Sequence, residues 1–464
     1  METVFGFDAA LLSRIQFAFT ISFHIVFPAF SIGLSAFIAT LEILWLRSGR
    51  QHFHVLARFW TKIFAVSFAM GVVSGIVMEY QIGTNWSRFS QVIGNTLGPL
   101  FAYEVLTAFF LEASFLGIML FGWNRFPPWL HTMASVFVAI GTALSGFWIL
   151  AANSWMQTPA GFAIENGVTY PVSWFEIIFN PSFPYRFTHM MIATYLTTSL
   201  VVAATGARYL LGGRFREEAM TMLRMGLGML AIMAPLQALV GDLHGLNTLK
   251  YQPAKIAAIE AHWEDKGPMD LVLFAWPDME QERNHAEIAI PRLGSLVLTH
   301  EWNGRVKGLK DYPRGDRPPV APVFFSFRLM VGLGVLMIAT GWLGCWLLWR
   351  RRIEATRWFL RALVHAWPVG FVALLVGWMV TEIGRQPWIA YGVLRTADAV
   401  SPVGAAQVLV SLLLFVLVYF VVFSVGIWYV HRMIVKGPHP GLPGPDTLPN
   451  RPLAGARPEG EVPA

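Results

Sequence analysis

The chain has 464 residues, of which 55% are hydrophobic and only 13% are charged. Because an ordinary soluble domain carries about 25% charged residues, this composition excludes a soluble globular protein and a disordered one. The net charge of +6 then indicates membrane topology and not nucleic-acid binding, and the single cysteine excludes a disulfide framework, a thiolate zinc site and an iron–sulfur cluster.

Long apolar runs predict an all-α, polytopic integral membrane protein with about nine transmembrane helices, since a helix needs about 20 apolar residues to cross the bilayer core. The runs are continuous and not alternating, which excludes a β-barrel. The first run is too long for a signal peptide and has no small-residue cleavage site, so we expect a retained helix. The nine spans cover residues 15–45, 58–80, 96–121, 130–153, 187–211, 220–241, 323–349, 358–382 and 404–431.

Basic residues between the spans predict their orientation. They gather after spans one, five, seven and nine, at Arg47, Arg50, Arg58, Arg214, Arg216, Arg350, Arg351, Arg352, Arg357, Arg432 and Lys436. By the positive-inside rule these segments and the C-terminus are cytoplasmic, and the N-terminus lies outside. We therefore expect six helices in 1–241, an outside loop over 242–322, three helices in 323–435 and a Pro/Gly-rich, disordered cytoplasmic tail over 436–464.

Ligating side chains inside membrane spans are functional candidates, and His24 is the clearest of them. It stands in the apolar stretch FTISFHIVFPAF and suits an axial haem ligand, although a neutral histidine bonded to a backbone carbonyl is the alternative. His189 and Met330 begin spans five and seven below the same membrane face, where they could hold one low-spin haem. Arg328, at the rim beside Met330, suits a haem propionate. For Met330 alone, core packing is the alternative, since the chain has 19 methionines.

Two carboxylates, Glu104 and Glu112, lie eight residues apart in span three. On a regular helix this spacing places them about 12 Å apart along the axis and within about 80° in azimuth. Two acids on one helix face could relay protons from the cytoplasm to a central site. The alternative is that one of them pairs with a basic group at depth, such as Arg14 or Lys62.

The outer end of span eight carries a third carboxylate, Glu382, next to Arg385. It suits either a ligand pocket or a surface carboxylate at the headgroup level. Trp378 lies one turn earlier on the same helix face and could contact a flat cofactor, with ordinary packing as the alternative.

Ordered segments in essentially every span resemble subunit I of the cytochrome bd-type quinol oxidases, in particular the cyanide-insensitive branch. The matching segments are LSRIQFAFTISFH, GVVSGIVMEYQIGTNWS, EVLTAFFLEASF, LSGFWILAANSWMQ, RFTHMM, KIAAIEAHWE, FSFRLM and GWMVTEIGRQPW. The GRQPW segment with an acid just upstream, and the AANSWMQTP segment, are specific to that family. The resemblance implies a bacterial inner-membrane enzyme with three haems, which reduces dioxygen to water with electrons from a quinol.

The resemblance also implies roles for the ligating residues. His189 and Met330 would be the axial ligands of a low-spin haem b, with Arg328 against that haem. His24 would ligate haem d, or a haem b in its place, and Glu382 would ligate the high-spin haem b. Family members differ in which central haem occupies which pocket, so these last two assignments can exchange.

Further residues take implied roles around the central haems. Trp378 would lie on the electron path, and Arg385 belongs to the same cofactor pocket. Glu104 and Glu112 would serve the proton path, helped by the hydroxyl of Ser145. The chain departs from the family here, because Ala113 and not a hydroxyl residue follows the second acid.

The outside loop carries Lys255 and Glu260, which match the quinol-loop residues of the family. The loop lacks the long insert of some members, so it is of the short type. The implied partners are a second membrane subunit, a small accessory subunit, ubiquinol or menaquinol, dioxygen and the bilayer. Because the loop is outside and the acids face the cytoplasm, the reaction would generate proton motive force without pumping.

Three other functions are worth comparing with this one. A haem–copper oxidase needs an adjacent pair of histidines for copper, and the sequence has no such pair. A membrane cytochrome b that only relays quinol electrons would keep His189 and Met330 without needing the other candidates, and it stays open as the alternative. A proton-coupled transporter would use Glu104 and Glu112 and contain no haem.

Overall fold

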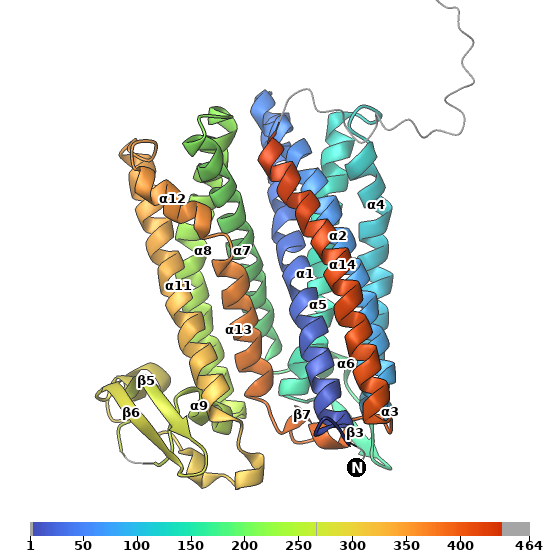
Figure 1. Cartoon of the computed structure of the whole chain (residues 1–464), viewed down its shortest axis with the longest axis vertical. Coiled ribbons are helices and arrows are strands. Elements are labelled where there is room, and N and C mark those ends of the chain that lie inside the picture. Colours follow the sequence, from blue (N-terminus) through green and yellow to red (C-terminus); the bar gives the residue numbers. More distant parts are fainter. Residues whose placement is uncertain (1–2, 266, 439–464) are drawn as a thin grey trace, which may run out of the picture.

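The computed structural model describes residues 3–265 and 267–438, most of which lie in long helices that run side by side in one bundle (Figure 1). The long helices are α1 (Ala9–Ser48), α2 (Gln51–Thr84), α3 (Ser87–Tyr103), α4 (Phe110–Phe121), α5 (Pro128–Gln157), α7 (Phe183–Leu211), α8 (Arg216–Tyr251), α11 (Val320–Trp349), α12 (Arg357–His365), α13 (Val369–Ile383) and α14 (Ala405–Lys436). Among the described residues, eight helical spans are long and apolar enough to cross a membrane, and the bent pair of α12 and α13 makes a ninth. The prediction of about nine transmembrane helices is confirmed.

Helix ends follow local signals in the sequence. The Asp8 carboxylate caps α1 by accepting from the backbone N–H of Leu11 at 2.7 Å. Gly49 ends the same helix with φ of 66°, a left-handed conformation that glycine adopts without strain. Pro368 lies in the break between α12 and α13, where the axis bends by 42°, because proline cannot donate a helical hydrogen bond. The predicted span 358–382 is therefore a broken one.

Span three is also irregular. A π-helical segment, Glu104–Phe109, joins α3 to α4. Since a π-helical turn holds more residues than an α-helical one, the spacing expected for Glu104 and Glu112 on a regular helix does not hold.

The segments that join the helices at one end of the bundle carry most of the remaining structure. We call this the loop end; it lies at the bottom of Figure 1. It contains the short helices α6 (Trp174–Ile178), α9 (Pro253–Ile259) and α10 (Leu293–Thr299). Its strands form two-stranded antiparallel sheets, β1 (Thr3–Val4) with β2 (Phe7–Asp8), β3 (Phe162–Glu165) with β4 (Val168–Pro171), β5 (Leu271–Asp278) with β6 (Arg283–Ile290), and β7 (Trp388–Ala390) with β8 (Leu394–Arg395).

These strands are absent from the all-α prediction, which holds for the membrane spans. The expected loop 242–322 also differs at its start, because α8 continues as a helix to Tyr251. Of the expected disordered tail 436–464, the part from 439 onward lies outside the described residues.

Helix α7 occupies the centre of the bundle. It packs against α1, α5, α8, α12 and α13. Of the residues in its most apolar stretch, 78% are buried inside the protein, the largest share of any span described. Side chains on α7 therefore face protein and not lipid, which gives its polar residues a protected setting.

Candidate functional site

His24 lies on α1 and faces α2. Its Nδ1 is 3.1 Å from the hydroxyl of Ser74, and that hydroxyl donates to the carbonyl of Gly71 at 2.8 Å. The serine oxygen is left to accept, so this arrangement favours a proton on Nδ1 and a free lone pair on Nε2. A Cβ at Gly75 would lie 3.2 Å from Cε1 of His24, so the ring packs closely on a glycine. The geometry suits a metal-binding imidazole held by an outer hydrogen bond.

His189 and Met330 come from α7 and α11, two helices that both pack against α8 and α13. A Cβ at Gly241 of α8 would lie 3.3 Å from Cε1 of His189, and one at Gly377 of α13 would lie 2.9 Å from Sδ of Met330. Nδ1 of His189 is buried and has no hydrogen-bond partner among the described residues. Both candidate ligands thus pack against a glycine of a neighbouring helix, as His24 does.

Helix α13 connects the two regions. Gly377 touches Met330, and the next residue, Trp378, contacts Phe17 of α1 with ring centroids 6.4 Å apart. Phe17 lies seven residues before His24 on the same helix, or about two turns. Trp378 therefore stands between the His24 helix and the Met330 contact.

A buried polar cluster surrounds Glu382 at the loop end of α13. Its carboxylate accepts from Asn153 of α5 at 3.0 Å and forms an ion pair with Arg385. Arg186 of α7 donates to the side-chain oxygen of the same Asn153 at 3.3 Å. Nε and Nη1 of Arg385 are buried without a partner among the described residues. Glu382 is therefore no surface carboxylate.

Lys255 of α9 belongs to the same cluster. Its ammonium group donates to the side chains of Gln157 at 2.7 Å and Gln252 at 2.8 Å. Burial is the main cause that lowers the pKa of Lys255 well below its usual value. With the two arginines, the cluster holds three basic groups and one carboxylate, so basic groups outnumber acidic ones. Such an excess in a buried site fits anionic groups such as haem propionates.

Glu260 and Arg328 pair with each other and not with the cluster around Glu382. Nη2 of Arg328 donates to Oε2 of Glu260 at 2.6 Å, and its Nε donates to the carbonyl of Val272 at 2.7 Å. Lys255 and Glu260 both come from the α9 region but face different helices, α5 and α11. The two expected quinol-loop residues thus have different partners, and Arg328 lies against a carboxylate of the loop.

The two acids of span three both face α5. Ser145 donates to Oε1 of Glu104 at 2.6 Å, and a Cβ at Gly141 would lie 2.6 Å from Cγ of Glu112. Gly141 and Ser145 are one helical turn apart. Both acids thus face α5 although the helix between them is irregular, and Glu104 bonds to a hydroxyl rather than to a basic group.

Sequence reasoning missed a buried polar contact at the opposite end of α5. There Nδ1 of His131 lies 2.9 Å from Oε2 of Glu42, and Ser135 donates to the other oxygen of that carboxylate at 2.8 Å. Next to Gly141 on α5, Thr142 is hydrogen-bonded to Ser35 of α1 at 3.0 Å. The sequence signal that could have found it is the acid Glu42 inside the predicted span 15–45.

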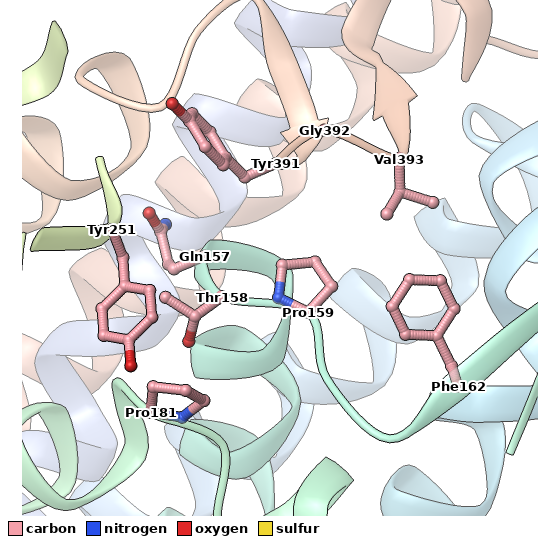
Figure 2. A pocket seen from close by; sticks show the side chains of 9 residues that line it. All are labelled: Gln157, Thr158, Pro159, Phe162, Pro181, Tyr251, Tyr391, Gly392 and Val393. Atoms are coloured by element: carbon pink, nitrogen blue, oxygen red, sulfur yellow. The ribbon is translucent and has the colours of Figure 1, made fainter. Parts of the chain in front are cut away.

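These contacts make α5 the shared wall of the site. Along its length it contacts Glu42, Glu112, Glu104, Glu382 and Lys255, through His131, Ser135, Gly141, Ser145, Asn153 and Gln157. A pocket of about 330 Å³ opens beside the last of these, with Tyr251 and Tyr391 on one side and Phe162 and Val393 on the other (Figure 2). We call these six residues of α5 the polar wall. It runs from one end of the bundle to a pocket at the other.

Comparison with known proteins agrees with this geometry. Residues 12–438 match the family described as Cytochrome bd terminal oxidase subunit I. The chain is 37% identical to cytochrome bd ubiquinol oxidase subunit 1 of Bacillus subtilis (strain 168), over 92% of this chain and 94% of that protein. It is 33% identical to cytochrome bd-II ubiquinol oxidase subunit 1 of Escherichia coli (strain K12), over 93% and 97%. A solved structure of bd oxidase from Geobacillus thermodenitrificans matches with a TM-score of 0.86 and 32% identity, covering 94% of this chain and all of that one.

Proposed function

We propose how the reaction is arranged in this chain, which belongs to the cytochrome bd terminal oxidase subunit I family and is the haem-bearing subunit I of a quinol:oxygen oxidoreductase. The reaction oxidises two quinols for each dioxygen reduced to two waters. It therefore needs a place where quinol loses protons, a set of haems and a supply of protons to the oxygen site.

The side chains described above are assigned to haems as follows. His189 and Met330 hold a low-spin haem b, and His24 and Glu382 hold the two central haems, a high-spin haem b and a haem d or a second haem b. Arg186, Arg385 and Lys255 face the propionates. When bound, the haems supply one-electron transfer and dioxygen binding.

Quinol is oxidised at the loop end, where Glu260 accepts a hydroxyl proton. Arg328 holds that carboxylate in place, and proton transfer to it requires that this ion pair loosens. Ubiquinol and menaquinol both suit a site of this kind. The loop end faces the periplasm of a bacterial inner membrane, and the C-terminal end of α14 faces the cytoplasm.

Protons for water formation come from the opposite end, along α5. His131 and Glu42 receive them, Ser135, Thr142 and Ser35 line the next stretch, and Glu112 and Glu104 deliver them with the help of Ser145. Hydroxyl and carboxylate side chains can each accept and pass on a proton, which suits them to a relay. Because quinol protons leave at one face and substrate protons enter at the other, charge separation needs no pump.

The chain works with a second membrane subunit and a small accessory subunit. The observation that carries the assignment of ligands is that His24, His189 and Met330 each lie on a glycine of a neighbouring helix. The test is a haem assay and oxygen uptake by the purified complex with reduced quinol. We expect iron porphyrin and quinol-dependent oxygen consumption; haem without oxygen uptake would favour a cytochrome b that only relays electrons.

A further inference from the structure

The hairpin of β5 and β6 presents an apolar face that the bundle leaves uncovered. Phe274 pairs directly with Ile288 across the hairpin, so both side chains lie on the same face. The register is shifted on both sides of Phe274, but Trp276 contacts the same ring, that of Phe325, as Phe274 does. Ile290 lies two residues beyond Ile288 on β6, on the same side of that strand. The exposed fractions of these four side chains are 46% and 61% for the pair, 63% for Trp276 and 41% for Ile290. An exposed patch of this kind on a membrane protein marks a binding surface.

This face continues onto α11. The rings of Phe274 and Trp276 lie 6.1 Å and 5.7 Å from the ring of Phe325. Leu329 and Leu336 follow Phe325 on the same side of the helix, at spacings of four and eleven residues, and are 47% and 50% exposed. Hairpin and helix thus form one apolar surface. Figure 1 shows the hairpin at the side of the bundle, next to the loop end of α11.

The length of α11 sets the depth of this surface in the membrane. The helix has 30 residues and is followed by Arg350. About 20 residues cross the hydrocarbon core, so the core reaches from Trp349 back to about Met330. Phe325 lies five residues beyond that point, in the interfacial layer where aromatic side chains concentrate.

We propose that the β5–β6 hairpin is an interfacial membrane anchor, whose face of Phe274, Trp276, Ile288 and Ile290 lies in the headgroup region of the leaflet at the loop end. The occupant is lipid because the face continues an apolar helix surface at the depth of the interface. Acidic residues outnumber basic ones in the hairpin and its turn, so the attraction is apolar and aromatic, and anionic lipid is not required.

The anchor has a consequence for the redox site. Arg328 donates to the carbonyl of Val272 in β5 and to the carboxylate of Glu260. A hairpin seated in the leaflet therefore holds Glu260 at the depth at which a lipid-dissolved substrate arrives. The anchor itself depends only on the membrane embedding of the chain and stands if the role of Glu260 fails.

Site-directed spin labelling of the whole oxidase complex in phosphatidylcholine nanodiscs tests the anchor. Cys345→Ser removes the native thiol, and Ile288→Cys places a label on the proposed face. Glu287→Cys, the neighbouring exposed position on the other side of β6, is the matched control. We expect the ratio of collisions with oxygen to collisions with a water-soluble nickel chelate to be severalfold higher at 288 than at 287.

Equal ratios at the two positions would place the face in water and overturn the proposal. A label at 288 that neither reagent reaches would also overturn it, because protein and not lipid would then cover the face. An unchanged haem spectrum shows that each variant is assembled. If Ile288→Cys fails to assemble, Trp276→Cys on the same face provides the same measurement.

Discussion

Arg328 and Glu260 form an ion pair at 2.6 Å that joins the start of α11 to the end of α9. The two residues are 68 positions apart in the chain, and both side chains are largely buried. The same guanidinium also bonds to the backbone of β5. A carboxylate fixed in this way has a defined position at the loop end and a basic neighbour.

Replacing Glu260 by Ala should slow quinol oxidation strongly, because the proton acceptor is lost and Arg328 is left unpaired. Turnover with an artificial electron donor that bypasses the loop should persist. Oxygen uptake with each donor measures the difference, and Glu280→Ala, in the exposed turn of the hairpin, is the control. Equal loss with both donors would contradict a role in quinol oxidation.

Replacing His189 or Met330 by Leu should abolish the low-spin haem signal and leave the chain inserted in the membrane. The reason is that each variant removes one of the two side chains proposed as ligands of that haem. The reduced-minus-oxidised spectrum of purified complex provides the measurement. Met337→Leu is the matched control, since Met337 is buried in an apolar cluster of the same helix and this exchange costs less than about 1.5 kcal/mol. An unchanged spectrum in the His189 and Met330 variants would remove them as ligands.

Replacing Gly241 by Ala should reduce the low-spin haem content, because the new methyl group would meet His189 at 3.3 Å. Gly245→Ala, one turn along α8, meets no atom within 4 Å and is the control. Alanine favours a helix over glycine by up to about 1 kcal/mol, so the control should be neutral or more stable. Haem content per protein and the thermal midpoint distinguish the two. If both variants keep full haem, close packing on Gly241 does not position the ligand.

Replacing Glu112 by Gln should slow oxygen reduction by about a hundredfold, because the amide cannot release a proton to the site. Haem content should stay normal, since Glu112 is assigned to proton delivery and not to a haem. Stopped-flow oxidation of the reduced complex by oxygen gives the rate. Glu354→Gln, at an exposed ion pair with Arg216, is the control. Wild-type turnover in Glu112→Gln would exclude this carboxylate from the proton path.

The sequence by itself determined the membrane spans and indicated the candidate ligands. Hydropathy depends on consecutive residues, so apolar runs predicted about nine spans before any contact was known. A histidine or acid in such a run is costly, which made His24, Glu112 and Glu382 visible. The motifs around them then indicated the family.

Only the tertiary structure decided which side chains meet. Glu42 and His131 are 89 residues apart, and Asn153 and Glu382 are 229 apart, so no local pattern predicts either pair. The same holds for the polar wall of α5, of which the sequence indicated Ser145 alone. The π-helical turn after Tyr103 and the pairing of Arg328 with Glu260 likewise depend on packing between helices, because hydrogen bonds and close contacts are set by distance in space and not by distance along the chain.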